Sequence, residues 1–122
     1  MVGGIAPATA AGWHGISGTT YSGCEQANQP TWFTSSNARY KDNYGGIYAK
    51  FTSIAPNGLG FKVLDSHNAT IGQVKYWTQS ETDYQQRFAS GVSNGKKFYN
   101  SFRETGTGCN TNNHEFVGSE YY

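Results

Sequence analysis

The stretch from Tyr44 to Trp77 most constrains the fold, because it holds three short β-prone runs separated by two turn signals. Pro56-Asn57-Gly58 supplies a fixed φ followed by two residues that tolerate positive φ, which suits a tight turn. Asp65-Ser66-His67-Asn68 is a second cluster of turn residues. The sequence therefore predicts an antiparallel meander of three consecutive strands, at Ile47–Ile54, Leu59–Leu64 and Thr70–Trp77.

Apolar and polar residues alternate in the first two runs, as they do in strands with one buried face. The positions predicted to be buried are Ile47, Ala49, Phe51, Leu59, Phe61 and Val63. The positions predicted to face outward are Tyr48, Lys50, Lys62, Lys75 and Trp77. Of these, Trp77 is the residue that folding explains least, so it is a candidate for ligand contact.

Further short runs continue this pattern along the chain, at Ile16–Tyr21, Gln86–Val92, Lys96–Arg103 and His114–Tyr122. Asn94-Gly95 is typical of a type I′ hairpin turn and predicts that the runs on either side of it pair. Thr78–Gln85 is a loop or one helical turn capped by Ser80 or Thr82. Many short strands without an amphipathic helix predict an all-β, single-domain antiparallel β-sandwich, or a small barrel.

Length allows one domain with one core, since the chain has 122 residues. We assign residues 13–122 to this domain. Residues 1–12 are expected to be a flexible N-terminal arm or a signal-peptide remnant, because Ala8-Thr9-Ala10 fits the small-x-small pattern before a cleavage point. No apolar run is long enough to span a bilayer.

Composition separates this chain from disordered and nucleic-acid-binding proteins. Aromatic residues make up 16% of the chain, whereas disordered chains are poor in them. The formal net charge is only +1, and proteins that bind a phosphate backbone usually carry a strong basic excess. We therefore expect a folded protein with no nucleic-acid partner.

The two cysteines, Cys24 and Cys109, are far apart in sequence. They are a disulfide if the protein is secreted and unrelated buried thiols if it is cytosolic. The composition is rich in Gly, Ser, Thr, Asn and Tyr and poor in Lys, Glu and Leu, which favours the disulfide and an extracellular location.

No motif in the sequence indicates catalysis or a cofactor. The histidines His14, His67 and His114 lack metal-ligand spacing, and their simplest interpretation is exposed loop or strand-edge residues. Glu104 and Glu115 flank one loop, where two carboxylates can approach each other, but surface carboxylates are the simpler interpretation. We therefore expect neither catalytic residues, nor a cofactor, nor a metal site.

Aromatic residues outnumber what one small core readily holds, so some are expected at the surface. Exposed Trp and Tyr supply rigid contact area at low entropic cost. The candidate ligand-binding residues are Trp77, Trp32, Tyr48, Tyr99 and Trp13. They suggest a secreted, non-catalytic binding module for a glycan or cell-surface ligand. The alternatives are a toxin or bacteriocin-like effector, an enzyme inhibitor, or a subunit of a secreted assembly, each acting through protein contacts.

Overall fold

The computed structural model describes residues 12–21, 24–26, 29–30, 32–105 and 113–122. Within these ranges the protein is all-β apart from one short 3-10 helix, η1 (Gln79–Glu81). Its strands are β1 (Trp13–Tyr21), β2 (Cys24–Gln26), β3 (Gln29–Pro30), β4 (Phe33–Thr34), β5 (Arg39–Tyr40), β6 (Gly45–Ser53), β7 (Leu59–Leu64), β8 (Lys75–Trp77), β9 (Gln86–Val92), β10 (Lys97–Glu104) and β11 (Asn113–Tyr121).

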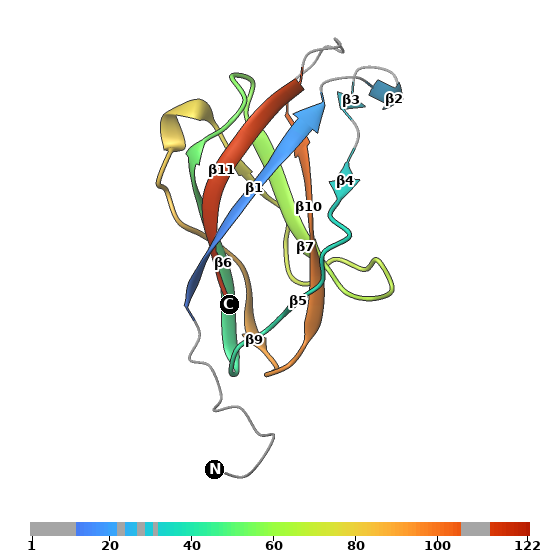
Figure 1. Ribbon diagram of the computed structural model, residues 1–122, viewed down its shortest axis with the longest axis vertical. Helices are drawn as coiled ribbons and strands as arrows, with labels where there is room; N and C mark the ends of the chain where they lie inside the picture. The colour runs from blue at the N-terminus through green and yellow to red at the C-terminus, as the bar shows by residue number, and fades with distance from the viewer. Residues whose placement is uncertain (1–11, 22–23, 27–28, 31, 106–112) are drawn as a thin grey trace.

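Two antiparallel sheets pack together as two layers (Figure 1). Sheet I has the strand order β1-β11-β6-β9. Sheet II has the order β4-β10-β7-β8, and β5 pairs with a further part of β10. The two-stranded pair of β2 and β3 is separate from both sheets. The all-β prediction is confirmed, and the arrangement is sandwich-like.

Large flat side chains fill the space between the sheets. Phe51 is fully buried and meets the rings of Phe61, Trp77 and Phe116 at centroid distances of 5.3, 4.7 and 5.7 Å. The six positions predicted to be buried from alternation, in β6 and β7, are all buried. Gly118 of β11 makes room for this packing, since a Cβ there would lie 2.6 Å from Phe51 Cδ1.

The predicted meander is confirmed only in its second half: β7 and β8 pair antiparallel, but β6 belongs to sheet I and β7 to sheet II. The connection after β6 passes from sheet I to sheet II and buries Ile54 and Ala55 before the turn at Gly58, which has a φ of +99°. Alternation predicts which side chains of a strand are buried. It does not distinguish two neighbours in one sheet from two strands that face each other across the core.

The predicted hairpin at Asn94-Gly95 is wrong for the same reason, since β9 lies in sheet I and β10 in sheet II. In this turn Lys96 N donates to Ser93 O, and of the central pair only Gly95 has positive φ, at +81°. A type I′ turn needs positive φ at both central residues, so this is the type II pattern.

The third predicted run is partly a strand. Thr70 forms an isolated bridge with Leu64, but Gly72 then takes a φ of +74° and interrupts the ladder. Gln73 N instead donates to Phe88 O of β9, and β8 begins only at Lys75. The helical turn that follows is capped by Thr78, whose N–H donates to Glu81 Oε1, rather than by Ser80 or Thr82.

Candidate functional site

A row of aromatic side chains crosses the outer face of sheet I. Trp13 of β1 is in register with Tyr121 of β11, Tyr121 with Tyr48 of β6, and Tyr48 with Arg87 of β9. These residues lie on the side opposite the core, because their neighbours Ile47, Ala49 and Glu120 point inward. We call Trp13, Tyr121 and Tyr48 the aromatic row.

The rings of the aromatic row meet edge to face. The Trp13 and Tyr121 centroids are 5.5 Å apart at 65°, and those of Tyr48 and Tyr121 are 5.7 Å apart at 76°. Lys50 Nζ lies 4.4 Å from the centre of the Trp13 ring. The three rings therefore form a faceted surface with a cation over the Trp13 ring, rather than a flat platform.

A pocket of about 370 Å³ lies over this row. Tyr44, which is 73% exposed, and Gln85 also contribute to its walls. The pocket also reaches Lys41, whose side chain is almost fully buried. It therefore combines aromatic surfaces with amide, hydroxyl and ammonium groups that can bond to a polar ligand.

The Lys41 ammonium donates to Asp42 O at 3.0 Å and Asn43 O at 3.1 Å. An ammonium has three N–H donors, so these two bonds leave one for a ligand in the pocket. Burial lowers the pKa of Lys41, and the nearby Asp42 carboxylate opposes that shift.

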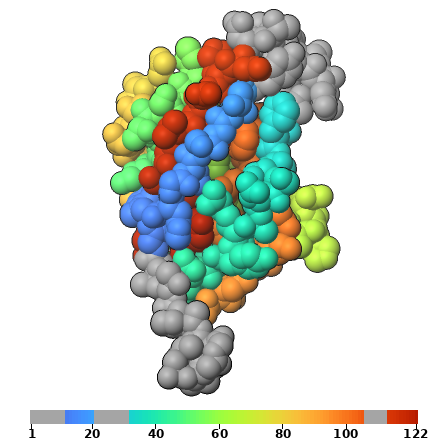
Figure 2. Space-filling model, viewed as in Figure 1, coloured from blue at the N-terminus to red at the C-terminus, as the bar shows by residue number. Residues whose placement is uncertain are grey.

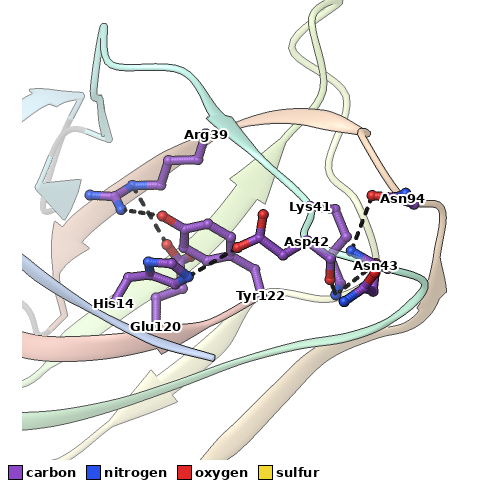
Figure 3. A network of polar contacts seen from close by, with 8 residues as sticks. All are labelled: His14, Arg39, Lys41, Asp42, Asn43, Asn94, Glu120 and Tyr122. Atoms are coloured by element: carbon purple, nitrogen blue, oxygen red, sulfur yellow. Dashed lines mark hydrogen bonds and ion pairs between the residues drawn. The ribbon is translucent and has the colours of Figure 1, made fainter. Parts of the chain in front are cut away.

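Backbone bonds fix the loop that carries Tyr44. Lys41 N donates to Lys96 O, and Gly95 N donates to Lys41 O. Asn43 N donates to the side-chain Oδ1 of Asn94 at 3.1 Å, as Figure 3 shows. Asn43 has a φ of 59°, which turns the chain sharply at this point. The loop is thereby tied to the turn before β10, and this bonding places Tyr44 beside the aromatic row.

A polar network on the inner side of sheet I holds the ends of β1 and β11 together (Figure 3). The rings of His14 and Tyr122 stack at 3.9 Å, and His14 Nε2 lies 3.4 Å from Asp42 Oδ2. Arg39 Nη1 donates to Tyr122 Oη at 2.9 Å. Because His14 and Tyr122 directly follow Trp13 and Tyr121 in the chain, this network also fixes two members of the row.

Glu120 lies at the inner end of the network and is fully buried. Its Oε1 accepts a bond from Asn100 Nδ2 at 2.9 Å and lies 3.7 Å from Arg39 Nε. Burial raises the pKa of Glu120 to about 7, although Asn100 and Arg39 both favour the charged form. The increase in the Glu120 pKa caused by desolvation is therefore larger than the decrease caused by the Asn100 hydrogen bond and the Arg39 cation together.

The structure brings together two of the five predicted ligand-binding residues, Trp13 and Tyr48. The predicted outward orientation of Trp77 is wrong: this side chain is 1% exposed and lies in the core. Its indole N–H donates to Tyr84 O at 2.7 Å, so its polar atom is satisfied as well. Trp77 is therefore no part of the candidate site.

The other two predicted residues, Trp32 and Tyr99, belong to the outer side of sheet II. Lys62 Nζ and Arg103 Cζ lie 4.1 and 4.8 Å from the centre of the Trp32 ring. Lys97 Nζ lies 5.7 Å from the Tyr99 ring. Two cations of the chain lie over the Trp32 ring and one, Lys50, over the Trp13 ring, so Trp32 has less free aromatic surface than Trp13.

Sequence reasoning missed Tyr121, Tyr44 and Lys41 as site residues. Tyr121 joins Trp13 to Tyr48 only through pairing between strands distant in sequence, which no local pattern reveals. Lys41 sits in a polar loop that gives no sign of its burial. The alternation of β11 does place Tyr121 outward, and this was the one available signal.

Glu104 and Glu115 do not approach each other as a pair. Glu104 is buried and lies 3.0 Å from His114 Nδ1, whereas Glu115 is exposed on the opposite face of β11. The interpretation of His114 as an exposed loop or strand-edge residue is therefore wrong, since His114 is half-buried on a strand that lies between two others. In the described ranges, no three His, Cys, Asp or Glu side chains are grouped so that they could hold a metal ion.

Two sequence predictions concern residues that the structure does not describe. Cys109 lies outside the described residues, so the Cys24–Cys109 bridge stays a prediction. The same holds for the N-terminal arm, of which residues 1–11 are not described. Among the described helices, none has the length and apolarity needed to cross a membrane.

Comparison with known proteins adds no assignment: no family model, curated protein or solved structure matches this chain.

Proposed function

We propose that the protein is a secreted, non-catalytic β-sandwich module that binds a glycan on the aromatic row. In this proposal a Cys24–Cys109 disulfide cross-links the module. The observation that supports glycan binding most is the register that aligns Trp13, Tyr121 and Tyr48 under one pocket on an exposed sheet face. Aromatic faces attract the C–H surfaces of sugar rings, while nearby polar groups bond to hydroxyls.

Charge around the pocket refines the ligand class. Lys41 lines the pocket, Lys50 lies over Trp13, and Arg87 continues the row at the β9 edge. Asp42, the nearby carboxylate, lies 3.4 Å from His14 Nε2 and also acts on Lys41, so it offsets only part of the positive charge. These three cations favour a glycan that carries carboxylate or other anionic groups over a neutral one.

We expect binding to a polysaccharide panel containing neutral and acidic members to be saturable and strongest for an acidic one. Trp13→Ala and Tyr48→Ala are each expected to weaken that binding about tenfold or more, as loss of a central aromatic contact does. Titration calorimetry on the best polysaccharide, with folding checked by circular dichroism, measures the effect.

Tyr99→Ala and Tyr76→Ala are matched controls, because both remove a ring from the other sheet. They are expected to leave affinity unchanged. Absence of binding to every glycan, or loss of affinity in the sheet II variants alone, would contradict the proposal.

Binding of a protein partner is the second candidate, and one observation favours it. A polar groove of about 770 Å³ runs beside the edge strand β9 and is lined by Gln73, Lys75, Gln86, Arg87 and Ser90 among others. Edge strands with free backbone groups accept an added strand from a partner. In that case Ser90→Pro would abolish capture of the partner, while Trp13→Ala would not.

A further inference from the structure

A second cavity, of about 310 Å³, lies between the two sheets. It opens where the edge of sheet II is interrupted: β4 and β5 both pair with β10, but residues 35–38 between them form no strand. Figure 2 shows this opening as a hollow between β1 and the segment at 32–40, with atoms of β7 and β10 visible at its base. The cavity is on the inner side of sheet I and so is distinct from the pocket over the aromatic row.

The base of the cavity is aromatic. Phe102 and Phe116 meet edge to face with centroids 4.7 Å apart, and Phe61 lies behind them at 6.4 and 6.2 Å. Gly18 of β1 admits these rings, because a Cβ there would come within 2.8 Å of Phe116. This wall suits the flat face or edge of another ring.

One wall of the cavity carries a buried hydrogen-bond acceptor without a partner. Asn100 is 4% exposed and lines the cavity. Its Nδ2 donates to Glu120 Oε1, and at a pH above the Glu120 pKa of about 7 the ionised carboxylate, which can only accept, fixes the amide in that orientation. Asn100 Oδ1 therefore has no hydrogen-bond partner among the residues that the structure describes.

A buried acceptor that lacks a partner has lost its bonds to water without replacement, and such groups are rare in folded proteins. The Asn100 side-chain amide cannot rotate to give Oδ1 another partner without breaking the bond from Nδ2 to the Glu120 carboxylate. Arg39, the cation at the rim, donates from Nη1 to Tyr122 Oη and lies 3.7 Å from Glu120, and it makes no hydrogen bond to Asn100 Oδ1. Oδ1 itself is almost fully covered, so a molecule that enters the cavity can supply the missing donor after a small shift of the Asn100 side chain.

We propose that this cavity binds a small aromatic molecule that carries one hydrogen-bond donor, such as a phenol or an aromatic alcohol. The ring packs against Phe102 and Phe116, and the donor bonds to Asn100 Oδ1. The volume is at the lower end of the range for small-molecule sites, so the ligand is a single ring with short substituents.

Phenol and toluene are suitable probes, because they are close in shape and only phenol has a donor. In NMR titrations we expect phenol to shift the resonances of Ile16, Phe102 and Phe116, and to bind about five- to tenfold more tightly than toluene, as one additional hydrogen bond predicts. Ser36→Trp should block the opening and abolish these shifts in a folded protein. Ser90→Trp, on the exposed surface of β9, is the matched control and should leave them intact.

Equal affinity for phenol and toluene would overturn the assignment of Asn100 as the recognition group. Shifts confined to Trp13 and Tyr48 would show that phenol binds only over the aromatic row. Ordered water as the only occupant, with no phenol shifts at millimolar concentration, would contradict the proposal as well. None of these results bears on whether the aromatic row binds a glycan.

Discussion

Trp77→Ala is expected to lower the free energy of unfolding by about 3–5 kcal/mol, the range for removing a large buried aromatic side chain. The indole is 1% exposed, meets Phe51 edge to face at 4.7 Å and packs against Phe88 at 5.9 Å. The substitution also leaves Tyr84 O without its donor. Urea unfolding followed by circular dichroism measures the loss.

Tyr76→Ala is the matched control, since Tyr76 is the neighbouring residue and is 49% exposed. Tyr76→Ala is expected to lower the free energy of unfolding by at most about 1 kcal/mol. Trp77→Phe is expected to lie between the two, because it keeps a ring in the core and loses the bond to Tyr84. If Trp77→Ala were as stable as Tyr76→Ala, Trp77 would not be the core residue described above.

Glu120→Gln is expected to make the protein more stable at about pH 8 and to have little effect at about pH 4.5. The pKa of Glu120 is raised to about 7 from 4.5 in the folded state. Between these values the folded protein binds more protons than the unfolded chain, so the stability contributed by this group falls as pH rises. Each pKa unit corresponds to 1.36 kcal/mol, so the full cost above pH 7 is about 3 kcal/mol.

Glutamine keeps the shape of the side chain and its carbonyl can still accept from Asn100, but it carries no charge to desolvate. We therefore expect a gain of about 2–3 kcal/mol at the higher pH, part of the full cost being offset by the lost attraction to Arg39. Denaturant titrations of both proteins at the two pH values measure it. Glu115→Gln, an exposed carboxylate on the same strand, should change stability little at either pH. An equal effect of Glu120→Gln at both pH values would contradict the assignment.

The sequence predicted the strands better than their partners. Alternation identifies Ile47, Ala49 and Phe51 as inward, because a strand with one buried face has apolar residues at every second position. Strand pairing produces no comparable local pattern in the sequence. β6, for example, lies between β11 and β9, both of which follow much later in the chain. The predicted pairing of β6 with β7 and the predicted hairpin of β9 with β10 are therefore wrong even where the strand bounds are close, whereas β7 and β8 do pair.

The candidate site was only partly predictable for the same reason. Trp13 and Tyr48 were selected as aromatic residues, but only the β1–β11–β6 pairing makes them neighbours, with Tyr121 between them. The sequence predicts Trp77 outside because it shares one side of its run with Lys75, two residues earlier. The change of backbone direction at Gly72 and the late start of β8 reverse that orientation, so that Tyr76 is exposed and Trp77 is buried.

The most direct test of glycan binding is an amide NMR titration of the protein with the polysaccharide that binds best in the panel. We predict that the largest shifts fall on the outer face of sheet I, at Trp13, Tyr48 and Tyr121, and in the loop that carries Tyr44. Residues of β10 and β7 should remain unperturbed. Shifts concentrated along the β9 groove or on sheet II, with no shifts in the aromatic row, would contradict glycan binding at the aromatic row.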